Sequence, residues 1–129
     1  MTAASQRITR HPAPVFPGIS DSVRVTAGDL LFVSGVVGLE SDGSAPSDFD
    51  RAVELTFAQL RRALDVAGAA FADIVRVNVY IVALYTERLA SYRTVRDRHI
   101  AAELPASTLI GVASLVAGAQ IEIDAVVAV

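Results

Sequence analysis

The spacing of apolar residues after position 47 predicts a helix. Apolar positions recur there at intervals of four and three residues, which is the period of one helix face. They are Val53, Phe57, Leu60, Leu64 and Ala67. Ser47 and Asp50 resemble a capping box before this stretch, and Gly68 fits the glycine that often follows a helix C-terminus. A second helix, with a weaker apolar stripe, is expected over residues 86–102.

Segments with the two-residue period of a strand surround these helices. Residues 22–26 alternate, and a tight turn at 27–29 leads into the apolar run 30–33, so we expect these segments to pair as a hairpin. Because that run is continuously apolar, it is expected to be covered on both faces. The remaining strands are expected over residues 73–82, 106–115 and 119–129, the last two joined by a turn at 117–118.

The resulting order, β-β-α-β-α-β-β, predicts an α+β fold with one sheet and both helices on one face. The other face of such a sheet needs a cover, and the last strand is apolar on both sides after Asp124. We therefore expect the sheet to self-associate. Residues 1–20, polar and then rich in proline, are expected to form an extended N-terminal arm, and residues 21–129 a single domain.

Composition supports association and narrows the available chemistry. Of the 129 residues, 53% are hydrophobic and 19% are charged, which is more apolar than a small monomer needs. All 11 basic residues are Arg, and Cys is absent. This excludes catalysis by a lysine Schiff base or a thiolate, as well as disulfides and thiolate-bound metals. His11 and His99 are isolated and form no metal motif, so we expect neither a metal nor a cofactor.

Charge and hydropathy argue against two kinds of partner. The net charge is −3 and the sequence pI is about 5.2, whereas nucleic-acid binding usually needs a basic footprint. The longest apolar stretch, residues 74–85, is too short to span a membrane and contains Arg76 and Asn78. Residues 1–20 lack the apolar core of a signal peptide. We therefore expect a cytoplasmic protein that binds neither nucleic acid nor membrane.

Five short runs stand out by their order and spacing. They are residues 27–35, 67–68, 73–80, 105–106 and 118–125. Together they resemble the Rid family of reactive intermediate deaminases, also called YjgF or endoribonuclease L-PSP, over nearly the whole chain. The resemblance implies a chorismate-mutase-like fold and a homotrimer whose sheets form a central barrel, with small-molecule ligands bound in clefts between subunits. Typical members hydrolyse imines and enamines such as 2-aminoacrylate to a keto acid and ammonia.

The resemblance also implies a set of site residues. Glu122 matches the acid that positions the attacking water, and Ser34 and Gly35 match residues that line the pocket. The family's carboxylate-binding Arg, its ligand-facing Tyr and a common helical Asn correspond here to Ser107, Ile19 and Arg93. Because losing a buried charge pair typically costs about 2–5 kcal/mol of binding, these changes imply a different ligand from that of typical members.

Several candidates also fit a purely structural role. Glu122 shares one side of its strand with Asp124, as a solvated or ion-paired strand face would. Ser107 is either a hydrogen-bonding group for a ligand or a small residue that fills space, and Thr108 beside it is a candidate of the same kind.

The second helix offers a further candidate site. Arg93, with Arg96 and Asp97, is either a replacement anion clamp or part of a solvated helix face with local ion pairs.

The residues and the resemblance together predict a small-molecule hydrolase that acts on imines or enamines with altered substrate specificity. Glu122 is the predicted catalytic residue. The predicted substrate-binding residues are Ser107, Thr108, Ser34, Gly35, Ile19 and Arg93. The alternative is a non-catalytic trimer that binds a metabolite or a partner protein. Ribonuclease activity is disfavoured by the acidic charge and the absence of Lys.

Overall fold

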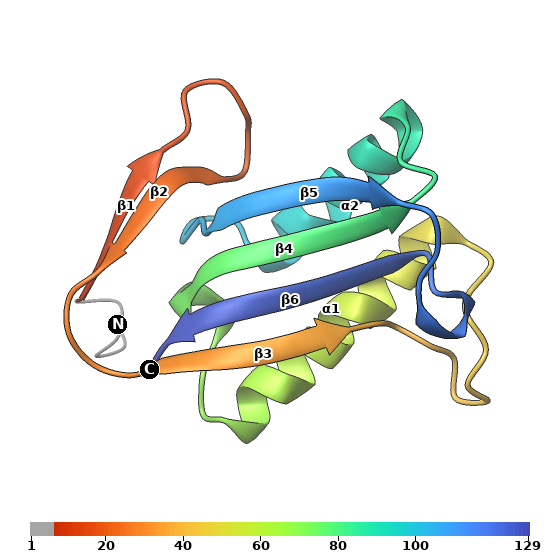
Figure 1. Cartoon of the computed structure of the whole chain (residues 1–129), viewed down its shortest axis with the longest axis horizontal. Helices are drawn as coiled ribbons and strands as arrows, with labels where there is room; N and C mark the ends of the chain where they lie inside the picture. The colour runs from red at the N-terminus through yellow and green to blue at the C-terminus, as the bar shows by residue number, and fades with distance from the viewer. Residues whose placement is uncertain (1–6) are drawn as a thin grey trace.

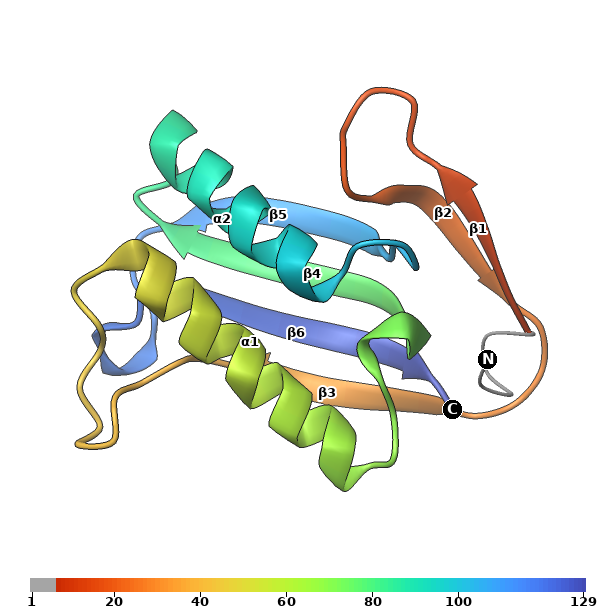
Figure 2. The same ribbon diagram turned by 180° about the vertical axis from the view of Figure 1, so that it is seen from behind.

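In the computed structural model, which describes residues 7–129, six strands form one mixed sheet and two helices cover one of its faces (Figures 1 and 2). The strands are β1 (Ile8–Pro12), β2 (Ser20–Val25), β3 (Leu30–Val36), β4 (Ile74–Val82), β5 (Ala106–Val112) and β6 (Ile121–Ala128). The helices are α1 (Phe49–Val66) and α2 (Thr86–His99), with short 3₁₀ turns η2 (Phe71–Asp73) and η3 (Val116–Gly118). The predicted α+β class is confirmed, as is the placement of both helices on one face.

The order of strands across the sheet is β1-β2-β5-β4-β6-β3. Strands β4 and β5 are parallel, whereas β6 lies antiparallel to both β4 and β3. The predicted hairpin between residues 22–26 and 30–33 is therefore wrong, since β2 pairs with β1 and β3 lies at the opposite edge against β6 (Figure 1). The apolar β3 pairs with β6, which is also apolar, and the two strands pack together against the helices. This pairing buries more apolar surface than pairing with the polar β2 would.

The segment expected as an N-terminal arm contributes strand β1, and residues 1–6 of that arm lie outside the described residues. Arg10 of β1 donates hydrogen bonds to the carbonyl oxygens of Ala72 (2.7 Å), Ile74 (3.1 Å) and Leu104 (2.7 Å). Burial lowers the pKa of Arg10, against the opposing effect of the nearby Glu103 carboxylate. These bonds connect the β1–β2 hairpin to the segments that lead into β4 and β5.

The ends of α1 follow the expected signals, with a shift of one residue at its start. The N-cap is Asp48 rather than Ser47, and its carboxylate accepts a hydrogen bond from the backbone N–H of Arg51 (2.9 Å). Gly68 takes a left-handed φ of 72° after the helix, and the N–H of Ala69 reaches back to the carbonyl of Leu64, as in a Schellman motif. The predicted C-terminal glycine is therefore confirmed.

The main core lies between the helices and the sheet. Alternate residues of β4 and β6 point toward α1 and α2 and are almost fully buried. The largest fully buried side chains include Phe57, Leu60, Leu64, Ile74, Ile81, Ile121 and Ile123. Helix α2 ends at His99 instead of residue 102, because Ile100 takes an extended conformation and enters this core.

The opposite sheet face is open in the single chain. Phe32 is 73% exposed, Leu30 47% and Ile110 45%, so the apolar run 30–33 is covered on one face only. Large apolar side chains at such exposure on one surface are typical of an interaction site.

A polar and aromatic cluster joins the end of α2 to α1. The His99 ring stacks on Phe57 with a centroid distance of 4.8 Å, and its Nε2 lies 3.0 Å from a carboxylate oxygen of Glu54. Arg98 donates to the other oxygen at 2.7 Å. Burial alone would raise the pKa of Glu54, but the hydrogen bonds from His99 and Arg98 outweigh it and lower this pKa overall.

This cluster predicts a pH dependence of stability. A carboxyl group with a lowered folded-state pKa stabilises the fold above its unfolded pKa of about 4.3, and this contribution is lost as the pH falls through the folded-state value. Glu54→Gln should therefore lose less unfolding free energy than the wild type between about pH 6 and pH 3, by about 0.5 kcal/mol for a pair this exposed. Urea titrations at both pH values measure it, with the exposed Glu87→Gln as control. Equal losses in wild type and Glu54→Gln would contradict the expectation.

Candidate functional site

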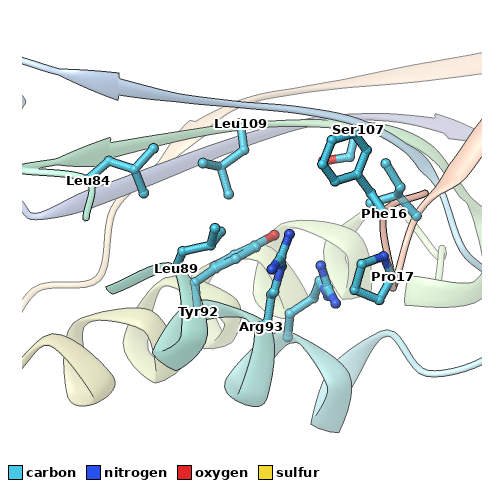
Figure 3. A pocket seen from close by; sticks show the side chains of 10 residues that line it. Phe16, Pro17, Leu84, Leu89, Tyr92, Arg93, Ser107 and Leu109 are labelled. Carbon is cyan, nitrogen blue, oxygen red and sulfur yellow. The ribbon is translucent and has the colours of Figure 1, made fainter. Parts of the chain in front are cut away.

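A cavity of about 330 Å³ lies between α2, β5 and the loop before β2 (Figure 3). The loop contributes Phe16, Pro17 and Ile19; α2 and the turn before it contribute Leu84, Leu89, Tyr92, Arg93 and Arg96; β5 contributes Ser107 and Leu109. Three predicted site residues, Ile19, Arg93 and Ser107, therefore meet at one cavity. No Asp or Glu is among its lining residues.

Strand alternation separates Ser107 from Thr108. Ser107 and Leu109 face the cavity, so Thr108 between them points to the other side of the sheet. There its hydroxyl oxygen accepts a hydrogen bond from Arg76 of β4 at 2.6 Å. Thr108 thus lies on the open face, away from the cavity.

The same open face carries a polar cluster on β4 and β6. Asp124 accepts hydrogen bonds from the Asn78 amide (2.8 Å) and from the Tyr80 hydroxyl (3.0 Å), one at each carboxylate oxygen. The hydrogen bond to Asp124 is the main cause that raises the pKa of Tyr80, with burial and the charge of Glu122 adding to it. Both oxygens of Asp124 are thus used in hydrogen bonds within the sheet, which indicates a structural role.

Glu122 has a different environment on that face. A β-bulge in β3 places Ser34 and Gly35 together opposite the single residue Asp124 of β6. A Cβ atom at Gly35 would lie 2.5 Å from the Glu122 carboxylate, so only a glycine lets this side chain lie against the β3 backbone. Among the described residues Glu122 makes no hydrogen bond or ion pair, which leaves both carboxylate oxygens available.

The predicted site residues thus fall into two groups on opposite faces of the sheet. The cavity face has Ile19, Arg93 and Ser107, and the open face has Ser34, Gly35, Thr108 and Glu122. Strand β4 lies between β5 and β6. Within one chain the two groups cannot contact the same ligand.

Arg96 is the cavity residue that the sequence indicated least clearly. Its side chain is only 7% exposed; Nε donates a hydrogen bond to a carboxylate oxygen of Asp97 (3.0 Å), and Nη2 forms an ion pair with the same oxygen (2.9 Å). A Cβ atom at Gly18, where φ is 76°, would overlap this guanidinium. The signal that points to it is helical spacing, since residues 92 and 96 lie one turn apart on α2. Burial raises the pKa of Tyr92 to about 12, so its hydroxyl stays neutral at the cavity wall.

Residues 7–129 contain neither a cluster of metal-binding side chains nor a membrane-spanning helix. No three His, Asp or Glu side chains in this part of the chain lie close enough to hold a metal ion. No helix there has the length and apolar character that crossing a bilayer requires.

The six-stranded mixed sheet with two helices on one face matches the chorismate-mutase-like α+β fold of the solved structures to which the chain is similar. The family model described as Endoribonuclease L-PSP matches residues 18–129, and the chain belongs to this family, the Rid or YjgF family. The resemblance seen in the sequence is thereby confirmed.

Individual relatives agree with this assignment. The crystal structure of YyfB from Yersinia pestis, a Rid-family protein of unknown function, has a TM-score of 0.83 and 26% identity, covering 95% of this chain and 99% of that one. The RutC family protein YjgH from Escherichia coli (strain K12) is 44% identical over 59 residues, 46% of this chain and 45% of that relative. A 2-iminobutanoate/2-iminopropanoate deaminase from Dermatophagoides farinae is 24% identical over 120 residues, 92% of this chain and 90% of the relative.

Proposed function

We propose that this chain hydrolyses small imines or enamines, with Glu122 as the residue that activates water. The observation that carries the proposal is the Glu122 carboxylate, which lies against Gly35 with no hydrogen bond or ion pair among the described residues. Neighbouring Asp124, by contrast, has both oxygens engaged. Family membership and the relative named as an iminobutanoate deaminase support the same reaction class.

The reaction needs little more than a positioned water and a proton carrier. A carboxylate accepts a proton from water as its oxygen attacks the carbon of the C=N bond, which gives a carbinolamine. The carboxylic acid then returns this proton to nitrogen, which completes the neutral carbinolamine. The carboxylate next accepts the hydroxyl proton and passes it to nitrogen, so that the C–N bond breaks, the carbonyl forms and ammonia leaves. One water is consumed for each C=N bond, and no redox partner is required. Glu122 fits this role because it is an acceptor without a competing donor.

A catalytic site that includes both faces requires a second copy of the chain. We infer a homotrimer in which the open face of one copy packs against a neighbour and brings its Glu122 to the neighbour's cavity. The exposed Phe32, Leu30 and Ile110 on that face supply apolar area for such an interface. The split of the predicted site residues between the two faces supports the same arrangement.

The mass in solution tests the assembly. Light scattering coupled to size exclusion should give about three times the chain mass of 13.6 kDa. Phe32→Asp, which puts a charge on the open face, should shift the protein toward a single chain, because an unpaired charge in an apolar interface is strongly unfavourable. Val66→Asp is the matched control, since Val66 is 80% exposed but lies on α1. A wild-type monomer, or a Phe32→Asp trimer, would contradict the inferred interface.

The proposed activity is tested with a panel of imines generated in solution, some with a carboxylate and some neutral. Ammonia release and loss of the C=N absorbance should both exceed the buffer rate for at least one class. If no member of the panel is hydrolysed faster than in buffer, the proposal fails. The non-catalytic alternative is favoured by Ser107, which supplies no cation from β5. Ligand-induced thermal stabilisation without turnover would identify it.

A further inference from the structure

The cations of the cavity come from helix α2, and one of them has no partner within residues 7–129. Arg93 makes no hydrogen bond or ion pair among the described residues, although it lines the cavity. In Figure 3, Arg93 and Tyr92 extend from α2 toward the strand that carries Ser107 and Leu109. A guanidinium with five free donors beside an apolar wall favours binding of an oxyanion.

Arg96 adds a second donor whose charge is already balanced. Its Nε and Nη2 atoms are used by Asp97, which leaves Nη1 without a hydrogen bond among the described residues. Its buried position against Gly18 and over the Tyr92 ring fixes the guanidinium. Because Asp97 compensates Arg96, this chain's own lining contributes the single positive charge of Arg93, and the neighbour's Glu122 would face the reacting carbon from the other side. A ligand that matches this lining carries one anionic group beside Arg93.

The rest of the wall selects the body of the ligand. Leu84, Leu89 and Leu109 lie along one end of the cavity, and Phe16 closes another part (Figure 3). A cavity of roughly 150 Å³ holds a benzene molecule, so the approximately 330 Å³ present here accommodates about a dozen non-hydrogen atoms. An aromatic or branched group with a short anionic tail fills this space.

We propose that the cavity binds a small organic monocarboxylate with a compact apolar body, and that Arg93, assisted by Arg96, holds the carboxylate on the helix side. Strand β5 then contributes the small Ser107 and the apolar Leu109 to the ligand's body instead of a cation. The inference that such a carboxylate is also the substrate rests on the proposed function. It assigns the hydrolase a substrate whose anionic group faces α2.

Binding is measured by calorimetry with 3-phenylpropanoate and its neutral amide, 3-phenylpropanamide. The acid should bind at least about tenfold more tightly, and Arg93→Gln should remove most of this preference, since it removes the cation that pairs with the carboxylate. Arg62→Gln removes the same charge from an exposed position on α1 and should leave the preference unchanged. Arg96→Lys, with its fold checked by thermal melting, should weaken acid binding by about threefold or more.

Three results would overturn the inference: no binding of the acid, equal binding of acid and amide, or an acid preference that survives in Arg93→Gln. The outcome is separable from that of the proposed function. Acid binding that depends on Arg93, without turnover of any imine, would support the ligand class of the cavity and contradict the proposed hydrolase activity. Imine turnover that depends on Glu122, with no preference for the acid, does the reverse.

Discussion

Replacing Glu122 with Gln should lower kcat/KM for imine hydrolysis by about 10²–10⁴-fold, the usual contribution of a positioned general acid–base group. The amide keeps the shape of the side chain but cannot accept a proton from water. Because Gln occupies the same space beside Gly35, the packing of β3 against β6 should not change. The melting temperature should therefore stay within about 2 °C of the wild type. Steady-state kinetics with the best imine of the panel measures the effect.

Two variants make the result specific to Glu122. Glu87→Gln removes an exposed carboxylate from the first turn of α2 and should leave kcat/KM unchanged. Asp124→Asn leaves a single acceptor oxygen for the two donors, the Tyr80 hydroxyl and the Asn78 amide, so it should reduce stability more than activity. If Glu122→Gln keeps kcat/KM within about twofold of the wild type, Glu122 is not the group that activates water, since a general base contributes far more.

The second large effect concerns stability. Arg10→Met should destabilise the fold by about 2–4 kcal/mol, because it leaves the carbonyls of Ala72, Ile74 and Leu104 without their donor. Methionine retains most of the length and the apolar contacts of the side chain. At a fixed protein concentration the melting temperature should fall by about 10 °C.

The matched control for Arg10 is Arg24, on the other strand of the same hairpin. Arg24 is exposed and makes no hydrogen bond or ion pair among the described residues, so Arg24→Met should shift the melting temperature by less than about 2 °C. If Arg10→Met were no more destabilising than Arg24→Met, the three hydrogen bonds would not anchor the hairpin.

The helices and strands were predictable where one face carries a strong period. Residues 53–67 follow the helical period and form most of α1, and residues 74–82 alternate as β4 does. Strand pairing was not predictable, because a turn signal such as the one at 27–29 is local. The partner of β3 is β6, which lies more than eighty residues further along the chain and so outside the reach of a local signal.

The candidate site was predictable in its residues more than in its arrangement. Strand alternation places Ser107 and Thr108 on opposite sides, yet the sequence does not say which side faces the helices. The position of Arg96 was harder to foresee, because it depends on Gly18, distant in sequence, whose missing side chain leaves room for the guanidinium. A helical Arg next to an Asp is otherwise typical of a solvated surface.

The cations at the cavity wall are guanidinium groups, and this determines how the wall would react with a carbonyl compound. A hydrolase of imines produces aldehydes or ketones, which condense readily with a neutral amine. A guanidinium is a poor nucleophile, so Arg93 and Arg96 at the cavity wall do not condense with a carbonyl compound as a primary amine does. With no lysine in the chain, its side chains offer no primary amine for such adducts. Under the proposed function, no lysine side chain of the protein would be exposed to the carbonyl product.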